Sequence, residues 1–190
     1  MTIHIIVGVP GAGKSFVLGK ALEGHEGKYK VLTFGTLMLE MAKEMGLADD
    51  RDKLRYLPKE KVDEMRLKIA EKIAAEEKDV ILDTHASMKT PQGYAPGLPF
   101  EVLEKLKPKT IIIIEGRAEE IMERRKTDQE KGLRNRADFG NEKDIEEWQR
   151  INRAFVAAYC AKAGSNLVII LNEQGNADEA AKKLREVLDI

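Results

Sequence analysis

The segment at residues 3–15 reads Ile3-His4-Ile5-Ile6-Val7-Gly8-Val9-Pro10-Gly11-Ala12-Gly13-Lys14-Ser15. Its first five residues form a mostly apolar run, typical of a strand covered on both faces. Residues 8–15 fit the pattern G-x-x-x-x-G-K-[S/T], and a helix-period segment follows. Glycines let backbone N–H groups curl around phosphate oxygens, and the helix N-terminus adds positive dipole. The segment therefore predicts a strand, a phosphate-binding loop and a helix; a glycine-rich turn that only closes a strand is the alternative.

Two side chains of this loop carry the expected chemistry. Lys14 reaches the β- and γ-phosphates of a bound nucleotide in such loops, and the Ser15 hydroxyl ligates Mg²⁺. Lys14 is therefore the first candidate catalytic group. The predicted binding site for the donor phosphates comprises Gly8, Val9, Pro10, Gly11, Ala12, Gly13, Lys14 and Ser15.

Continuous apolar runs recur along the chain and predict the rest of the fold. Besides the first run they cover residues 31–34, 80–82, 111–114 and 167–171. Helix-period segments lie between them, at about residues 14–23, 36–45, 58–77, 117–125, 145–163 and 177–188. Alternating strands and helices predict an α/β fold, with a five-stranded parallel sheet covered by helices on both faces.

Composition narrows the class of protein. The chain has 190 residues, 43% of them hydrophobic and 34% charged, with a formal net charge of -1. Such a chain is long enough for one domain with a sizeable core, and its near-neutral charge gives no field for binding nucleic acid or an anionic membrane. Because the single Cys160 forms no internal disulfide and no run reaches the roughly 18 apolar residues of a membrane span, we expect a cytoplasmic location.

Two connections are too long or too polar to be simple turns. Residues 84–99 contain three prolines and two glycines and are expected to form an irregular surface loop, a type of segment that is often functional. Residues 124–140 are locally cationic and follow the fourth strand, where a lid could fold over the phosphates with Arg134 and Arg136. The alternative for this segment is a solvated run of charges.

Arg124 and Arg125 end the helix that precedes this cationic segment. One of them is expected to face the nucleotide, while the other caps helix carbonyls. Arg124 is therefore counted with Arg134 and Arg136 among the catalytic candidates, which stabilise negative charge during phosphoryl transfer.

Asp83 ends the third strand, so it is expected at the carboxyl edge of the sheet. There it would hold Mg²⁺ through water, although an Asp that caps the following turn is the alternative. His85 would bond a substrate phosphate, orient Asp83, or simply be satisfied by backbone groups.

Residues 49–55 place Arg51 and Arg55 four apart. If the segment is helical, two guanidinium groups on one face suit a phosphate monoester. A ladder of ion pairs with the neighbouring aspartates is an equal alternative.

Taken together, these motifs resemble the archaeal adenylate kinases, a branch of the P-loop nucleoside monophosphate kinases. The residues that carry the resemblance are the G-x-P-G-x-G-K loop, Phe34-Gly35-Thr36, the D-R-D-x-x-R segment, the D-T-H-A-x-x-K-T-P loop and Arg134-Asn135-Arg136. The resemblance spans nearly the whole chain. It implies the reaction ATP + AMP ⇌ 2 ADP with Mg²⁺, a short lid at about 124–140 and a homotrimer.

The resemblance also implies an AMP-binding helical segment at about residues 36–77 of a single domain, 1–190. The implied AMP-binding residues are Thr36, Arg51, Arg55, His85 and Lys89. The chain departs from bacterial and eukaryotic relatives here, because no arginine follows Thr36 closely and residues 83–87 read D-T-H-A-S instead of D-G-F-P-R.

Two other functions stay open at this point. A P-loop kinase could serve another nucleoside monophosphate or a small metabolite hydroxyl, for which Asp83 is the well-placed base. A nucleotide-hydrolysing switch is the candidate from another class, although Asn172-Glu173-Gln174-Gly175 lacks the guanine signature N-K-x-D.

Overall fold

The computed structural model describes residues 1–50, 53–130 and 140–190, with the backbone alone at Arg55. Its main sheet has five parallel strands in the order β2-β3-β1-β6-β7. Each predicted apolar run contributes one of these strands, which are β1 (Ile3–Val7), β2 (Lys30–Thr33), β3 (Val80–Asp83), β6 (Thr110–Glu115) and β7 (Asn166–Leu171). Phe34, the last residue of the second run, instead begins the next helix. The predicted fold class is confirmed.

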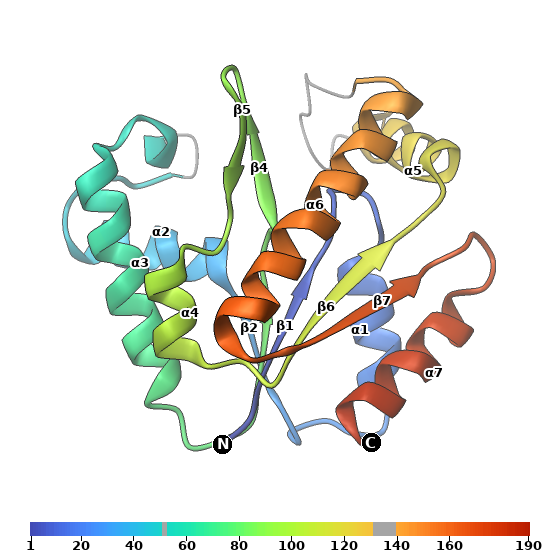
Figure 1. Cartoon of the computed structure of the whole chain (residues 1–190), viewed down its shortest axis with the longest axis horizontal. Helices are drawn as coiled ribbons and strands as arrows, with labels where there is room; N and C mark the ends of the chain where they lie inside the picture. The colour runs from blue at the N-terminus through green and yellow to red at the C-terminus, as the bar shows by residue number, and fades with distance from the viewer. Residues whose placement is uncertain (51–52, 131–139) are drawn as a thin grey trace.

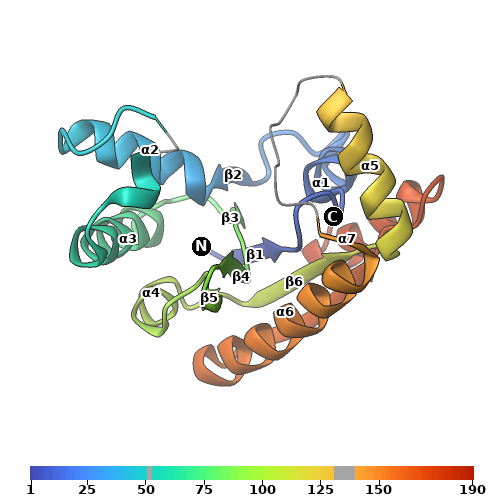
Figure 2. The ribbon, with the colours of Figure 1, turned by 90° about the horizontal axis from the view of Figure 1, so that it is seen from above.

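Helices cover both faces of the sheet (Figures 1 and 2). Side chains alternate along a strand, so Ile6, Ile112 and Ile114 share one core with α1 (Lys14–Leu22) and α7 (Ala177–Leu188). Their neighbours Ile5 and Ile113 point to the opposite core. That core is completed by α2 (Phe34–Glu44), α3 (Lys59–Ala74), α4 (Phe100–Leu106) and α6 (Glu142–Ala163).

The two edge strands correct one expectation. Continuous apolar runs predicted strands covered on both faces, yet Val31 of β2 is exposed, as are Leu167, Ile169 and Leu171 of β7. The reason is position, because β2 and β7 end the sheet. Ile170 points to the α7 side and is buried, while its neighbours on the other face of β7 are partly uncovered.

Residues 84–99 are not an irregular loop. They contain an antiparallel hairpin of β4 (Ser87–Thr90) and β5 (Gly93–Pro96), which stands above the carboxyl ends of the main sheet in Figure 1. Thr90 closes its turn, since its Oγ1 accepts from Gln92 N and donates to Gly93 O. These short polar strands lack the apolar run by which the main strands were recognised.

Two further elements surround the carboxyl edge of the sheet. The 3-10 helix η1 (Lys53–Tyr56) lies between α2 and α3, and α5 (Ala118–Glu130) follows β6. Helix α5 continues past the expected end at Arg125, so it takes up the first part of the proposed lid at 124–140. Within the described residues, no helix combines the length and the apolar character needed to cross a bilayer.

Candidate active site

The glycine-rich loop joins the carboxyl end of β1 to the first turn of α1. Gly11 and Gly13 adopt φ values of 89° and 88°, which side chains other than glycine rarely tolerate. Gly13 is the residue that caps α1, and Ala12 N donates to Val9 O over 3.2 Å. The loop therefore forms a tight turn that ends at a helix N-terminus, the arrangement the motif predicts for phosphate binding.

Close approach makes two of the glycines obligatory. A Cβ added at Gly8 would lie 2.3 Å from Ile114 O, and one added at Gly13 would lie 2.3 Å from Nδ2 of Asn172. Both contacts are too short for real atoms. The glycines thus serve packing against β6 and the segment after β7 as well as phosphate access.

Lys14 and Asp83 meet at the base of the loop. Lys14 Nζ lies 3.6 Å from Asp83 Oδ1 and 3.4 Å from Gly8 O, which accepts its hydrogen bond. Strand pairing explains the meeting, because β1 and β3 are neighbours and Ile6 is in register with Asp83. The side chains of Lys14 and Asp83 are only 12% and 18% exposed, so their charges are weakly screened.

Ser15, the second residue of α1, is exposed beside this pair. A serine hydroxyl and an aspartate carboxylate form an oxygen-only donor set, which fits the preference of Mg²⁺. Such sites need only one or two protein oxygens when phosphates supply the others. In the described residues, no cluster of three His, Cys, Asp or Glu side chains suggests a metal held by protein alone.

Arg124 and Arg125 reach the loop from α5, and one of their expected roles is corrected. Arg125 is 3% exposed and its Nε donates to Pro10 O over 2.7 Å, so this guanidinium binds the loop instead of capping helix carbonyls. Arg124 Nη2 donates to Asn172 O and contacts Glu120. Its Nη1 is buried, has no hydrogen-bond partner among the described residues and lies near Gly13, where it suits an anionic ligand.

A second polar anchor comes from the segment after β7. Asn172 is 4% exposed, and its Nδ2 donates to Ala12 O over 2.8 Å. Neighbouring contacts tie the same segment to α5, with Gln174 N donating to Glu120 and Glu173 pairing with Arg117. The phosphate loop is therefore held from α5 and from β7 at once.

A pocket of about 720 Å³ lies between the amino-terminal half of α3, the hairpin and the start of α4. Its wall is largely apolar, with Val62, Met88 and Val102. Arg66 and Asp63 add a charged pair, joined over 3.3 Å. A pocket with apolar walls and a few charged groups is typical of small-molecule sites.

Helix α6 holds the base of the hairpin through buried polar contacts. Trp148 Nε1 donates to Ser87 Oγ over 3.0 Å, and that hydroxyl donates to Asn152 Oδ1 over 2.6 Å. Tyr159 donates to Ala86 O over 2.8 Å, and burial raises the pKa of its phenol further above neutral pH. The hairpin therefore has a fixed base.

The neighbouring Cys160 offers no nucleophile. Its thiol is buried, and burial raises its pKa. Because the thiolate is the reactive form of cysteine, Cys160 belongs to the core and not to the chemistry of the site.

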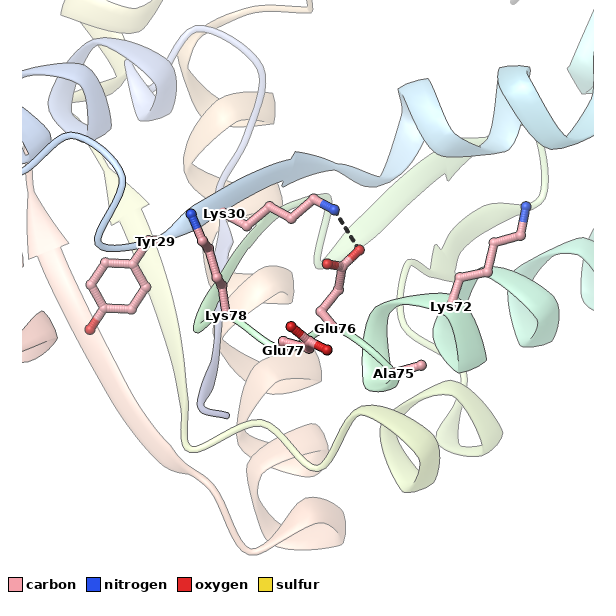
Figure 3. Close-up of a pocket in the computed structure, with 7 residues that line it drawn as sticks. All are labelled: Tyr29, Lys30, Lys72, Ala75, Glu76, Glu77 and Lys78. Atoms are coloured by element: carbon pink, nitrogen blue, oxygen red, sulfur yellow. Dashed lines mark hydrogen bonds and ion pairs between the residues drawn. The ribbon is translucent and has the colours of Figure 1, made fainter.

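Another hollow, of about 610 Å³, lies at the opposite edge of the sheet (Figure 3). Its lining includes Lys30 and Lys78, which lie at the amino ends of β2 and β3. Lys30 pairs with Glu76 over 2.6 Å, as the dashed line in Figure 3 shows. This hollow lies at the amino ends of the strands, whereas the phosphate loop follows the carboxyl end of β1. Ligands of parallel sheets bind at the carboxyl ends, so the hollow is not part of the phosphate site.

Comparisons with known proteins agree with this geometry. A family model described as "AAA domain" matches residues 7–146. The adenylate kinase of Methanopyrus kandleri is 43% identical over 189 residues, covering 98% of this chain and 97% of that protein. The adenylate kinase of Pyrococcus abyssi is 41% identical, covering 99% and 95%, and that of Methanocaldococcus jannaschii 42%, covering 98% and 97%. The chain belongs to the archaeal adenylate kinase family.

Solved structures extend the likeness to the fold alone. A shikimate kinase from Bacteroides thetaiotaomicron gives a TM-score of 0.58 at 12% identity, covering 100% of this chain and 99% of that one. A shikimate kinase from Acinetobacter baumannii in complex with shikimate gives 0.56 at 16% identity, covering 100% and 94%. The adenylate kinase family therefore shares its architecture with kinases of other acceptors.

The residues predicted to bind AMP are less concentrated than those around the phosphate loop. Thr36 is exposed near the start of α2, and His85 is exposed just after β3. Lys89 is exposed on β4, paired in register with Tyr94, which packs on Trp148 of α6. Met88 and Ala95, on the other face of the hairpin, line the 720 Å³ pocket.

The remaining predicted cations lie outside the described part of the chain. These are Arg51, Arg134 and Arg136, while Arg55 is described only as backbone within η1. The alternative for residues 49–55 was a ladder of ion pairs between the arginines and aspartates of that segment. In the described residues, Asp49 and Asp50 pair with a lysine instead, since Lys53 lies 2.6 Å from Asp49 and 3.7 Å from Asp50.

Sequence reasoning missed Asn172, Arg66 and the Ser87–Asn152–Trp148 network. Asn172 carried one available signal, because it directly follows a strand that ends at the same edge as Asp83. The Ser87–Asn152–Trp148 network carried none, since Ser87 is distant in sequence from its two partners. Arg66 carried none either, because single polar residues on helices usually face solvent.

Proposed function

We propose that this chain catalyses reversible transfer of the γ-phosphoryl group of ATP to AMP, giving two ADP, with Mg²⁺ as the required ion. The observation that carries the proposal is identity near 40% to adenylate kinases along almost the entire chain, on a fold with Lys14 against Asp83 below the phosphate loop. A carboxylate and a lysine at this edge are what phosphoryl transfer from a nucleoside triphosphate requires.

The donor site is the loop from Gly8 to Ser15, with the ATP phosphates over the first turn of α1. Lys14 would leave its contacts with Gly8 O and Asp83 to bind the β- and γ-phosphates. Arg124, with the buried Nη1 beside Gly13, supplies a second cation. Arg134 and Arg136 remain proposed lid cations, placed there by family resemblance.

Ser15 and Asp83 would hold Mg²⁺, the carboxylate acting through water. When bound, the ion neutralises charge on the β- and γ-phosphate oxygens. Every other contribution comes from the chain itself, which aligns the two nucleotides, supplies fixed cations and excludes water.

The acceptor site is proposed at the 720 Å³ pocket and its rim. Its apolar wall suits a nucleoside, and Arg66 lies in it as a partly buried cation. Thr36, Arg51, Arg55, His85 and Lys89 remain candidates for contacts with AMP. The acceptor needs no general base, because an AMP phosphate oxygen is already anionic and bonds directly to the γ-phosphorus as the bond to the β-phosphate oxygen breaks.

A cytoplasmic homotrimer is the proposed form of the protein. The stripe of Leu167, Ile169 and Leu171 on β7 is a candidate contact surface, since these apolar side chains are 40–44% exposed side by side at the sheet edge. Light scattering after size exclusion tests this assembly. A trimer that Ile169→Asp dissociates is expected, and a monomeric parent protein contradicts it.

An acceptor panel tests the activity. Mg-ATP is incubated with AMP, GMP, CMP or UMP, and nucleotides are separated by HPLC, with no-acceptor and Lys14→Ala controls. We expect rapid diphosphate formation with AMP and loss of it in the variant. Faster turnover of another monophosphate would identify that nucleotide as the acceptor in place of AMP. ADP release without any acceptor would favour the hydrolysing switch.

A further inference from the structure

Two carbonyl groups of the phosphate loop are held by side chains from outside the loop. Ala12 O accepts from Asn172 Nδ2 over 2.8 Å, and Pro10 O accepts from Arg125 Nε over 2.7 Å. Both donors are almost fully buried, at 4% and 3% exposed. Such contacts hold their groups in place, because a buried donor that loses its partner destabilises the fold.

The planarity of the peptide bond turns these contacts into a statement about the loop's N–H groups. In a trans peptide unit the C=O and the following N–H point in opposite directions. Fixing Ala12 C=O toward Asn172 therefore points Gly13 N–H away from Asn172. In the same way, fixing Pro10 C=O toward Arg125 points Gly11 N–H away from Arg125. Gly11 and Gly13 are the two loop residues with positive φ, where the backbone has most freedom to rotate.

The rest of Asn172 is immobilised as well. Its backbone N donates to Glu115 O over 2.8 Å, and its carbonyl accepts from Arg124 Nη2 over 3.3 Å. A Cβ on Gly13 would lie 2.3 Å from Nδ2 of Asn172, too close for both atoms. The lack of a side chain at Gly13 thus lets the Asn172 amide reach the loop backbone.

We propose that Asn172 is a positioning residue that orients the Gly13 N–H toward the phosphates of the donor nucleotide, with Arg125 doing the same for Gly11. The proposal rests on the proposed function only in taking ATP as that donor. Its consequence is selective, because losing the Asn172 amide weakens phosphate binding at the loop and leaves the acceptor site unaffected.

The experiment compares Asn172→Leu and Asn172→Ala with matched variants of a second buried asparagine. Leucine keeps the branched shape of asparagine and removes the donor without adding charge. Asn152→Leu and Asn152→Ala are the controls, since Asn152 is 1% exposed and binds Ser87 instead of the loop. Calorimetry gives the Kd for Mg-ATP, competition gives the Ki of inorganic tripolyphosphate, and steady-state kinetics give KM for AMP.

For both Asn172 variants we expect ATP and tripolyphosphate to bind about tenfold more weakly, the size of one lost hydrogen bond near 1.4 kcal/mol. The KM for AMP should stay within twofold. Both Asn152 variants should bind ATP as the parent does. Circular dichroism confirms folding, and the leucine variant keeps the test valid if the alanine variant unfolds.

Three outcomes would overturn the proposal: unchanged ATP affinity in Asn172→Leu, equal weakening in Asn152→Leu, or weaker ATP with unchanged tripolyphosphate, which would place the effect on the base. Failure of the proposed function has a different signature. A parent protein that binds ATP but does not phosphorylate AMP contradicts that function and leaves the binding comparison intact.

Discussion

The two sides of the carboxyl edge are built differently. On the donor side, backbone groups form the site, and buried side chains from α5 and β7 hold that backbone over distances of 2.7 and 2.8 Å. On the acceptor side, side chains of α3, α4 and the hairpin line an apolar pocket, and Met88 is 36% exposed. A site made of backbone needs a fixed spacing of glycines, whereas a pocket made of side chains can be built from many residue combinations. The donor side can therefore be predicted from the sequence, and the acceptor side cannot.

Removal of the loop lysine should give the largest effect and bears on the donor side alone. We expect Lys14→Ala to lower kcat by at least about 10³-fold, because a fixed cation at the developing charge is lost. Lys20→Ala, on the same helix and paired with Asp178, is the control and should retain activity. A Lys14→Ala enzyme with most of its turnover would exclude the assigned donor site.

Glycine substitutions sharpen the comparison further. Gly13→Ala should destabilise the fold by about 1–3 kcal/mol and weaken ATP binding, because φ is 88° and the new Cβ meets Asn172. Gly19→Ala, inside the helix that Gly13 caps and with nothing within 4 Å of the new Cβ, should instead stabilise by about 0.5–1 kcal/mol. Urea denaturation measures both. Equal effects of the two substitutions would show that the loop is not sterically constrained.

The acceptor side should respond to the hairpin base. Trp148→Phe removes the donor to Ser87 Oγ, so we expect KM for AMP to rise about threefold to tenfold while KM for ATP stays within twofold. Phe155→Leu, which alters α6 packing beside Tyr159 without removing a hydrogen bond of the hairpin base, serves as the comparison. If both KM values rise together in Trp148→Phe, the hairpin does not serve the acceptor alone.

The smallest expected effect lies away from both sides. His4 is 2% exposed, and its pKa is lowered by burial first and by Lys109 second, with Asp79 opposing. The unfolded chain then binds a proton at His4 more readily than the folded chain does. The contribution of His4 to the free energy of unfolding is therefore complete above about pH 6.5 and is lost as pH decreases below that value. His4→Leu should flatten this dependence in urea titrations between pH 7.5 and 5.5. A pH dependence that persists unchanged in His4→Leu would contradict this assignment.

What the sequence could predict follows from the same contrast. The five apolar runs and the glycine spacing identified the parallel sheet, the loop and the place of Asp83 at the carboxyl end of β3. The hairpin escaped because Ser87–Thr90 and Gly93–Pro96 carry no apolar alternation. The role of Arg125 was misjudged because its partner, Pro10 O, lies 115 residues away, and a helix-end arginine ordinarily caps its own helix.

Asn172 is a second residue whose contact with the loop could not be predicted from the sequence. Its position after β7 was readable, but the approach of its amide to Gly13 depends on how β7, β6 and β1 lie side by side. Local pattern gives strands and turns, while contacts between distant segments are set by the order of the strands in the sheet.

Direct transfer between the two sides is the central claim, and a labelled phosphoryl group tests it. ATP carrying ³²P at the γ-position is incubated with the protein, Mg²⁺ and unlabelled AMP, and the products are separated. We expect the label in the β-phosphate of ADP formed from AMP, with negligible labelled inorganic phosphate. Label that appears as inorganic phosphate, at a rate independent of AMP, would contradict the account.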